Sequence, residues 1–333
     1  MKVALSGAAG RLLPALALVN LLLVSLLWFA ETFIAERHWL TILVTYAPQH
    51  PFGVPTLLLL AAAAWRRNWL AGVASVVAGA ICLFALLGLR VPLGARQTNG
   101  GIPIRVMTYN IHEASAGAEK VAEVIRRLEP DVVCLQEARP PAGSPDPVAV
   151  LKELLPGWHV ARHGEVAIFS RHPIRAHQGQ NAPLNPGRAF LQAELSVQGR
   201  RLSLIAVHLT TAAHPGRLLR NPGPTADQLR TTARVRAAQV DTLLAMAEAL
   251  PAPRVIAGDF NTPPRGRLYR RLTRHHRDAF DAAGRGFGHT FRTDRPVLRI
   301  DHILTTPDLR VDGCFVPRES VSDHLPLVAD LRL

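Results

Sequence analysis

Long uncharged apolar runs occupy most of the first ninety residues of the chain. Residues 12–30 and 69–89 contain no charged side chain, and each run is long enough to cross a hydrocarbon core of roughly 30 Å as a helix. The first run exceeds the apolar core of a signal peptide, about 7 to 15 residues, which favours an uncleaved anchor. A third uncharged run, residues 41–64, is interrupted by three prolines and predicts either a kinked span or a re-entrant segment. The pattern predicts a transmembrane segment over residues 1–90.

The apolar runs become short after a linker at residues 91–103, and one domain is expected over residues 104–333. Short apolar or alternating runs bounded by Gly, Pro and polar residues are typical of strands. Residues 118–128 and 225–250 have apolar side chains at helical spacing. Strands mixed with a few helices predict an α/β fold in which two packed β-sheets are flanked by helices. The strands are expected at residues 104–109, 131–135, 166–170, 189–195, 202–208, 254–257, 298–304 and 325–331.

Charge divides unevenly between these two parts. The chain has a net charge of +13 and a mean hydropathy of +0.14. Residues 1–100 contain seven basic and two acidic residues, a charge of +5, which leaves +8 on the rest. Of the 38 basic residues 35 are arginine, and a diffuse positive charge alone is weak evidence for nucleic-acid binding. The composition excludes a disordered chain, and three cysteines exclude a disulfide scaffold.

The basic residues of the membrane segment also predict its orientation. If residues 41–64 cross, three spans place the domain on the side opposite the N-terminus. Lys2 and the Arg66–Arg67 pair then lie inside, while Glu31 and Glu36 lie outside. Basic residues favour the cytoplasmic side. The charge pattern therefore predicts an integral membrane protein of a bacterial-type cell membrane with an extracytoplasmic domain, an orientation that depends on residues 41–64 crossing.

Polar side chains follow the predicted strands at the point where each strand ends. Each has a structural explanation when taken singly, such as turn formation by asparagine or aspartate. Together, carboxylates, amides and imidazoles on neighbouring strand ends describe a site for a hard divalent cation and a phosphate. These residues are Asn110, Glu137, His208, Asp259, Asn261, Asp301, Asp323 and His324.

Seven motifs carry a resemblance to a known family: TYNIH, CLQEA, AIFSRHPI, AVHLT, GDFNTPP, RIDHIL and SDHLPL. In this order, across nearly all of residues 104–333, they resemble the endonuclease/exonuclease/phosphatase superfamily, to which deoxyribonuclease I belongs. The resemblance implies a four-layer α/β sandwich that hydrolyses a phosphoester with an activated water. It also implies Mg²⁺ as cofactor, with Mn²⁺ as the alternative. Three spans before such a domain resemble a membrane-anchored branch associated with glycopeptide-class resistance, and this resemblance makes a polyprenyl pyrophosphate of cell-wall synthesis a candidate substrate.

The metal and the attacking water are expected at three of these residues. Glu137 is the expected principal Mg²⁺ ligand, because this cation is usually held by only one or two carboxylates. Asp323 is expected to touch the metal shell. Asp259 is expected to orient or deprotonate the attacking water, with Asn261 donating to a phosphate oxygen.

The phosphoryl group is expected to meet the remaining residues. His324 would bind it as an imidazolium oriented by Asp301. His208 would donate to an oxygen that gains charge in the transition state, and Asn110 would position the phosphate or a metal-bound water. These six residues, Asn110, His208, Asp259, Asn261, Asp301 and His324, are the predicted catalytic set.

Three further residues are candidates for contact with substrate: His112, Arg188 and His289. His112 stands where abasic-site endonucleases carry an acidic metal ligand, a difference that suits a phosphatase or lipid-phosphate branch better. Arg188 and His289 fall near strand ends, although surface arginines are abundant in this chain. Glu165 is a candidate to support a histidine.

The expected function is therefore a membrane-anchored, Mg²⁺-dependent phosphohydrolase that cleaves a phosphoester or pyrophosphate bond of a membrane lipid. Its partners are the bilayer and an anionic, phosphate-containing substrate. The alternative is a membrane-tethered nuclease, which the low aromatic content of 6% disfavours, because single strands usually stack on aromatic side chains. A catalytically silent scaffold is the third hypothesis, and the complete set of polar strand-end residues argues against it.

Overall fold

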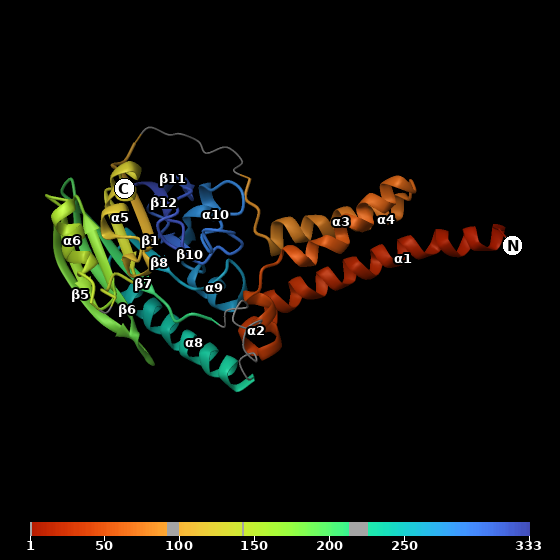
Figure 1. The fold of residues 1–333 in the computed structure, drawn as a ribbon, viewed down its shortest axis with the longest axis horizontal. Helices are drawn as coiled ribbons and strands as arrows, with labels where there is room; N and C mark the ends of the chain where they lie inside the picture. Colours follow the sequence, from red (N-terminus) through yellow and green to blue (C-terminus); the bar gives the residue numbers. More distant parts are fainter. Residues whose placement is uncertain (1, 92–99, 142, 213–225) are drawn as a thin grey trace.

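The computed structural model describes residues 2–91, 100–141, 143–212 and 226–333. A bundle of apolar helices extends from one end of an α/β sandwich (Figure 1). The sandwich contains two mixed six-stranded sheets, in the strand orders β11-β12-β1-β2-β4-β3 and β5-β6-β7-β8-β10-β9. The strands of the first sheet are β1 (Pro103–Asn110), β2 (Val132–Gln136), β3 (His159–His163), β4 (Val166–Ser170), β11 (Arg310–Phe315) and β12 (Leu327–Arg332). Those of the second are β5 (Ile174–Ala182), β6 (Asn185–Val197), β7 (Arg200–His208), β8 (Arg254–Asp259), β9 (Arg277–Asp278) and β10 (Asp301–Thr305).

Helices cover the outer face of each sheet and complete four layers. Apolar side chains of both sheets, such as Ile168 and Leu204, form one buried core between them. Helices α5 (Ala118–Leu128) and α6 (Pro147–Leu154) pack on the outside of the first sheet. Helices α8 (Ala226–Ala249) and α9 (Gly266–Leu272) pack on the second, while the short α10 (Ala279–Ala283) contacts β11. The predicted α/β sandwich is confirmed.

The helical bundle consists of three helices that lie side by side. They are α1 (Lys2–Phe29), α3 (His50–Trp65) and α4 (Trp69–Ala80), which continues into η3 (Ile81–Leu86). The chain runs toward the sandwich in α1, away from it in α3 and back in α4 (Figure 1). Two stretches, Arg11–Arg37 and Trp69–Leu86, are long and apolar enough to cross a membrane.

The predicted run 41–64 does not form one continuous helix. It divides into α2 (Trp39–Tyr46) and α3, with a break at residues 47–49. Pro48 has no backbone N–H to continue the helix. The Gln49 side chain donates to the carbonyls of Val44 (2.8 Å) and Ala47 (3.1 Å) at the end of α2. The helix α2 consequently leaves the bundle and packs on the sandwich beside α8.

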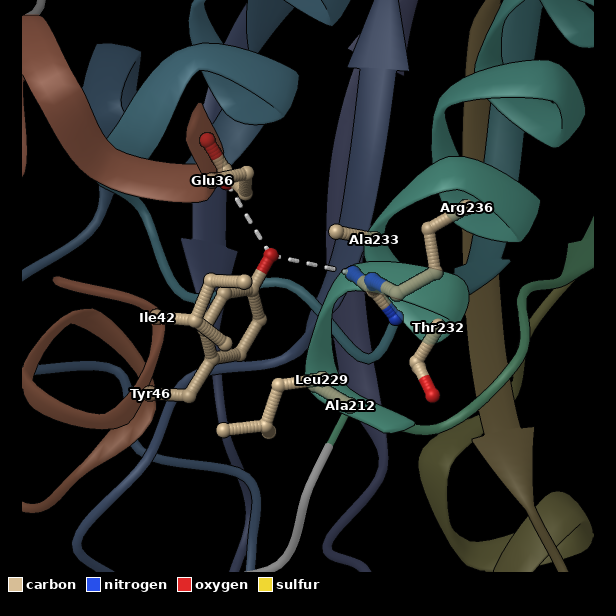
Figure 2. Close-up of a pocket in the computed structure, with 8 residues that line it drawn as sticks. All are labelled: Glu36, Ile42, Tyr46, Ala212, Leu229, Thr232, Ala233 and Arg236. Carbon is tan, nitrogen blue, oxygen red and sulfur yellow. Dashed lines mark hydrogen bonds between the residues drawn. The ribbon is translucent and has the colours of Figure 1, made fainter. Parts of the chain in front are cut away.

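A polar junction joins the helical bundle to the sandwich. Arg265 donates to the carbonyls of Thr45 (2.7 Å), Ala47 (2.9 Å) and Leu86 (3.2 Å), which lie at the ends of α2 and η3. The Tyr46 hydroxyl donates to Glu36 (3.1 Å) and accepts from Arg236 (3.3 Å), as Figure 2 shows.

Arg236 is buried and also donates to the Phe260 carbonyl (3.4 Å) and the Thr262 hydroxyl (2.5 Å). The segment that follows β8, residues 260–265, is therefore tied to α2 and η3 by Arg265 and, through Arg236 of α8, to the Tyr46 hydroxyl of α2.

The sequence pattern missed several elements of the sandwich: β3, β5, β9, β11, α6, α9 and α10. Strand β5 is largely exposed, so its sequence lacks the apolar alternation that marks a half-buried strand. The strand expected at 298–304 begins only at Asp301, because Leu298 forms an isolated bridge with Phe291 instead. The start of the helix expected at 225 and most of the linker at 91–103 lie outside the described residues.

Candidate active site

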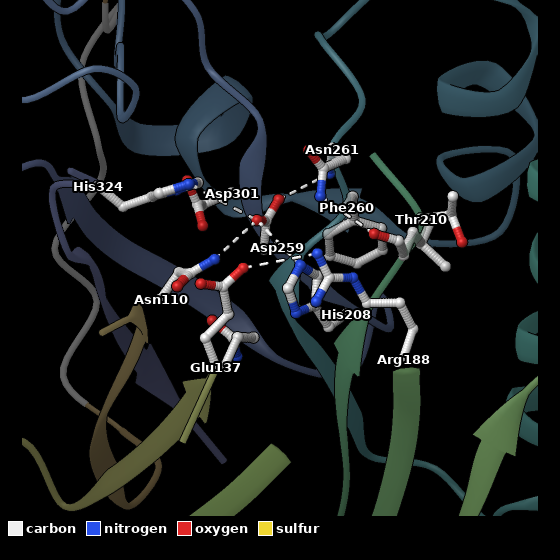
Figure 3. Close-up of polar contacts among 12 residues, drawn as sticks. Asn110, Glu137, Arg188, His208, Thr210, Asp259, Phe260, Asn261, Asp301 and His324 are labelled. Carbon is white, nitrogen blue, oxygen red and sulfur yellow. Dashed lines mark hydrogen bonds and ion pairs between the residues drawn. The ribbon is translucent and has the colours of Figure 1, made fainter. Parts of the chain in front are cut away.

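The candidate site lies where neighbouring strands of both sheets end. Strand β1 runs parallel to β2, and β7 runs parallel to β8, with His208 in register with Asp259. Asp301, at the start of the antiparallel β10, is also in register with Asp259. Because parallel strands end at the same edge of a sheet, the polar residues that follow them converge there. Figure 3 shows the resulting cluster, in which Asn110, His208 and His324 surround Asp259.

Asp259 is the centre of this cluster. One of its carboxylate oxygens, Oδ2, accepts from the Asn110 amide (3.1 Å) and lies 3.4 Å from His208 Nε2 and 3.7 Å from His324 Nε2. The other, Oδ1, accepts from the backbone N–H of Asn261 (2.8 Å). Asp259 is only 1% exposed, so its carboxylate is oriented by fixed donors rather than by bulk water.

His324 is held as a cation by the two nearest carboxylates. Its Nδ1 lies 2.9 Å from Asp301 Oδ2, and both side chains are buried. Burial alone would lower the pKa of His324, but the charges of Asp301 and Asp259 and the hydrogen bond to Asp301 raise that pKa to about 10. A buried imidazolium next to the reacting centre can donate to a phosphate oxygen.

Glu165 joins the cluster through His208. The His208 ring is fully buried, and its Nδ1–H donates to Glu165 Oε2 (2.9 Å). The same oxygen accepts from the backbone N–H of Glu137 (2.8 Å). Burial alone would raise the pKa of Glu165, but the charges of His208 and Arg188 and these hydrogen bonds lower it below the usual value. Glu165 thus orients the ring that faces Asp259 and the backbone that carries Glu137.

Backbone strain marks two residues of the cluster. Glu137 has a φ of 54° and Asn261 a φ of 48°, both in the left-handed region that residues other than glycine rarely adopt. His112, two residues beyond Asn110, has a φ of 47°. Such conformations persist where surrounding contacts fix them and cluster at functional sites.

Two partly exposed pairs of side chains lie at the edge of the cluster and form its rim. Arg188 lies 3.5 Å from the Glu137 carboxylate, with side-chain exposures of 18% and 21%. His112 Nδ1 lies 3.6 Å from Asp323 Oδ1, with exposures of 52% and 42%. The structure thus brings two of the three predicted substrate residues beside the predicted metal ligands, in places that solvent reaches.

The third predicted substrate residue, His289, lies apart from the cluster. Among the described residues, its ring contacts Phe287 (5.4 Å) and His50 of α3 (5.5 Å), and its Nδ1 lies 3.0 Å from the Pro296 carbonyl oxygen. Burial lowers its pKa to about 4. The contact with His50 therefore places His289 against the helical bundle.

The donor set of the site fits a hard divalent cation. The atoms of Asp259, Asp301 and His324 that could ligate a metal lie within 4.8 Å of one another, a grouping that the sequence did not suggest. However, an imidazolium has no free lone pair to offer a metal, and His324 is cationic in this geometry. Glu137 offers a carboxylate beside the Asn110 amide and facing Asp259 (Figure 3), and oxygen ligands of this kind suit Mg²⁺.

Comparisons with known proteins agree with this geometry. A sequence model described as the Endonuclease/Exonuclease/phosphatase family matches residues 107–324. The structure resembles an endonuclease/exonuclease/phosphatase from Beutenbergia cavernae, with 26% identity over 69% of this chain and 72% of that chain and a TM-score of 0.54.

Two more distant structures share the fold alone. They are a mannosyl-6-phosphatase of Bacteroides thetaiotaomicron (16% identity, 69% and 100% covered, TM-score 0.55) and D. rerio TDP2 complexed with a single strand DNA product (17%, 69% and 99%, TM-score 0.53). No curated protein matches the chain.

Proposed function

Because the chain belongs to the endonuclease/exonuclease/phosphatase family, we propose that it is a membrane-anchored phosphohydrolase acting on a lipid phosphate or pyrophosphate. The chain is a metal-dependent hydrolase of phosphoester bonds, as members of this family are. The observation that carries the proposal is the junction. In the segment that follows Asp259, Arg265 donates to carbonyls at the ends of α2 and η3, and Arg236 links this segment to the Tyr46 hydroxyl, so the site and the membrane segment share one end of the domain.

The surface of the helical bundle supports membrane insertion. Leu22, Leu57 and Leu58 are 57%, 66% and 67% exposed, and contiguous apolar surface of this kind is rare on soluble proteins. Trp65 and Trp69 flank the turn farthest from the sandwich and are 86% and 77% exposed. Tryptophan is enriched at membrane–water interfaces.

The orientation follows from the basic residues at that same turn. Arg66 and Arg67 lie between the two tryptophans, and the N-terminus lies at the same end of the bundle (Figure 1). Since basic residues favour the cytoplasmic side, we place this end inside and the sandwich outside. In this arrangement α1, α3 and α4 with η3 are three spans, and residues 104–333 are an extracytoplasmic catalytic domain.

We assign the metal to Glu137, with Asp323 near its shell. Bound there, Mg²⁺ would supply charge neutralisation at the phosphate and polarise a water. Asp259 accepts the proton of the attacking water, because its carboxylate is oriented by Asn110 and Asn261. His208, whose Nε2 lies 3.4 Å from Asp259 Oδ2, donates to an oxygen that gains charge in the transition state.

The substrate phosphate is bound by the cationic and amide groups around it. His324, held as an imidazolium by Asp301, donates to a nonbridging oxygen where charge develops. Arg188, at the rim beside Glu137, contacts a second oxygen or a second phosphate. A pyrophosphate substrate would offer one phosphate group to each of these two cations.

A lipid substrate is favoured by the position of the site. An enzyme tethered in the bilayer meets a lipid at a high effective concentration, and the sequence resemblance suggests a polyprenyl pyrophosphate. Hydrolysis of a nucleic acid is the second candidate, since one structural neighbour was crystallised with a single strand DNA product.

The test is an assay of the detergent-solubilised full chain with Mg²⁺ against polyprenyl pyrophosphate, a phospholipid and plasmid DNA. We expect phosphate release from the pyrophosphate, loss of that activity in Asp259→Ala, and full activity in Asp308→Ala, an exposed aspartate outside the cluster. Cleavage of DNA alone would replace the lipid proposal with the nuclease. Wild-type protein that hydrolyses none of the three would refute both.

A further inference from the structure

An arginine-lined groove lies beside the junction, outside the catalytic cluster. It has a volume of about 490 Å³ and is formed by α8, α9 and η2 (Ala35–Arg37). Glu36 is the one acidic residue among those that line it, and no residue of the predicted catalytic set contributes to it. The five basic residues that line it are Arg37, Arg230, Arg234, Arg267 and Arg271.

Among the residues that the structure describes, two of these arginines are paired with a carboxylate. Arg230 lies 2.8 Å from Asp227, and Arg271 contacts Asp241. Both pairs are exposed, and such pairs exchange readily with other anions because they contribute little free energy. Within the described ranges, no ion pair is formed by the other three arginines of the groove, Arg37, Arg234 and Arg267.

Glu36 offsets only one of the five positive charges, and both of its carboxylate oxygens are already hydrogen-bonded. One oxygen accepts from the backbone N–H of Arg267 (2.8 Å) and the other from the Tyr46 hydroxyl (3.1 Å). Partial burial and the neighbouring charges of Arg37, Arg270 and Arg271 lower the pKa of Arg267, against the opposing effect of Glu36. The groove therefore has an excess of positive charge that an anion would relieve.

The groove begins where the apolar surface of the first span ends. Arg37 is the last residue of the stretch Arg11–Arg37, and Phe33 and Ile34, one turn before it, are exposed. Arg270 contacts this end of the first span. Its guanidinium lies 5.6 Å from the centre of the Phe33 ring, and it donates to the Thr32 carbonyl. A lipid beside α1 would therefore have its acyl chains against apolar side chains and its headgroup at the groove.

We propose that this groove binds the phosphate-bearing headgroup of an anionic membrane lipid, at a site separate from the catalytic one. Guanidinium groups form bidentate hydrogen bonds with phosphate oxygens, and the volume of the groove falls in the range of ligand sites, about 300 to 1,000 Å³. Leu268, Ala233 and Ala237 add apolar lining for the glycerol part. The proposal rests on the membrane anchoring described above but not on the reaction.

The test measures lipid binding by the full chain in dodecyl maltoside, with fluorescently labelled phosphatidylglycerol as the probe. The groove variant is Arg234→Gln/Arg267→Gln. Its matched control is Arg175→Gln/Arg201→Gln, two exposed arginines on β5 and β7. Each basic residue near an anionic surface strengthens binding about fivefold, so we expect the groove variant to bind about 25-fold more weakly and the control to match the wild type.

Competition with other ligands identifies the source of the phosphate. Phosphatidylglycerol should displace the probe, while phosphatidylcholine and soluble glycerol phosphate should displace it poorly. Equal displacement by glycerol phosphate would overturn the lipid source in favour of a free phosphoester, and equal displacement by a single-stranded oligonucleotide would overturn it in favour of nucleic acid.

Unchanged affinity in the groove variant would overturn the site itself. Asp259→Ala should bind the probe as the wild type does, so a failure of the hydrolase proposal would leave this measurement intact.

Discussion

Replacement of Glu165 by alanine should destabilise the domain strongly. This carboxylate is 4% exposed, and its Oε2 accepts from the His208 ring (2.9 Å) and the Glu137 backbone (2.8 Å). Glu165→Ala leaves both donors buried without a partner, at a cost of about 1 to 3 kcal/mol each. The sum agrees with the roughly 3 to 5 kcal/mol observed when one partner of a buried pair is removed.

The conservative variant separates hydrogen bonding from charge. In Glu165→Gln, the amide oxygen can still accept from both donors, but the charge is lost. Its NH₂ would take the place of Oε1, for which the described residues offer no hydrogen-bond partner. We therefore expect an intermediate loss of about 1 to 2 kcal/mol.

Thermal unfolding of the full chain in detergent measures these effects. At about 2 to 4 °C per kcal/mol for a domain of this size, Glu165→Ala should lower Tm by roughly 10 °C. The control Glu194→Ala, which breaks the exposed pair with Arg201 (3.3 Å), should change Tm by less than about 2 °C.

The pH dependence supplies a second readout. The folded-state pKa of Glu165 is lowered from 4.5, so its contribution is present above that value and is lost as the pH falls through the lowered pKa. The difference between wild type and Glu165→Ala should therefore shrink in acid. A Tm within 2 °C of the wild type, or equal losses in the alanine and glutamine variants, would show that Glu165 does not hold these donors.

Three further predictions concern the catalytic cluster. Asp301→Asn should lower the pKa of His324 from about 10 and move the alkaline limb of the kcat/KM profile to lower pH, since the imidazolium is lost as the pH rises through its pKa; an unchanged profile would exclude a role for this cation. Gly258→Ala would place a methyl carbon 1.9 Å from a main-chain oxygen of β7 and should cost on the order of 3 kcal/mol, whereas Gly72→Ala, with nothing within 4 Å, should leave Tm unchanged. Removal of divalent cations with EDTA should abolish activity, and Glu137→Gln should raise the Mg²⁺ concentration needed for half-maximal activity at least tenfold; unchanged metal dependence would move the metal to other ligands.

The parts of the fold that the sequence predicted are those with a clear apolar pattern, either a strand buried on both faces or a helix with one apolar face. Strand β4 was expected at residues 166–170 and lies there, because all of its residues are buried and most are apolar. The helix α5 was also expected with its observed bounds, since its apolar side chains share one face. Strand β5 escaped prediction, because it is mostly exposed and polar and pairs at the edge of its sheet.

The residues of the candidate site could be predicted from the sequence for a related reason. Its residues follow strands whose apolar pattern is clear, as Asn110 and Asp259 do, so their position at the sheet edge follows from the strands themselves. Contacts between distant segments carry no such pattern. The hydrogen bonds of Arg265 to carbonyls about 180 to 220 residues away and the contact of His289 with His50 depend on how the helical bundle docks.

Arg265 limits how the catalytic domain can be produced in isolation. Its side chain is only 10% exposed, and three of its hydrogen bonds end on carbonyls at the ends of α2 and η3. A fragment that begins after the linker would lose all three acceptors, together with the Tyr46 hydroxyl that Arg236 contacts. The affected residues lie in the segment that follows Asp259, although Phe260 and Thr262 would keep their hydrogen bonds to Arg236 of α8. Attempts to obtain a water-soluble enzyme by truncation should therefore include compensating substitutions at Arg265, or retain the helices and accept detergent.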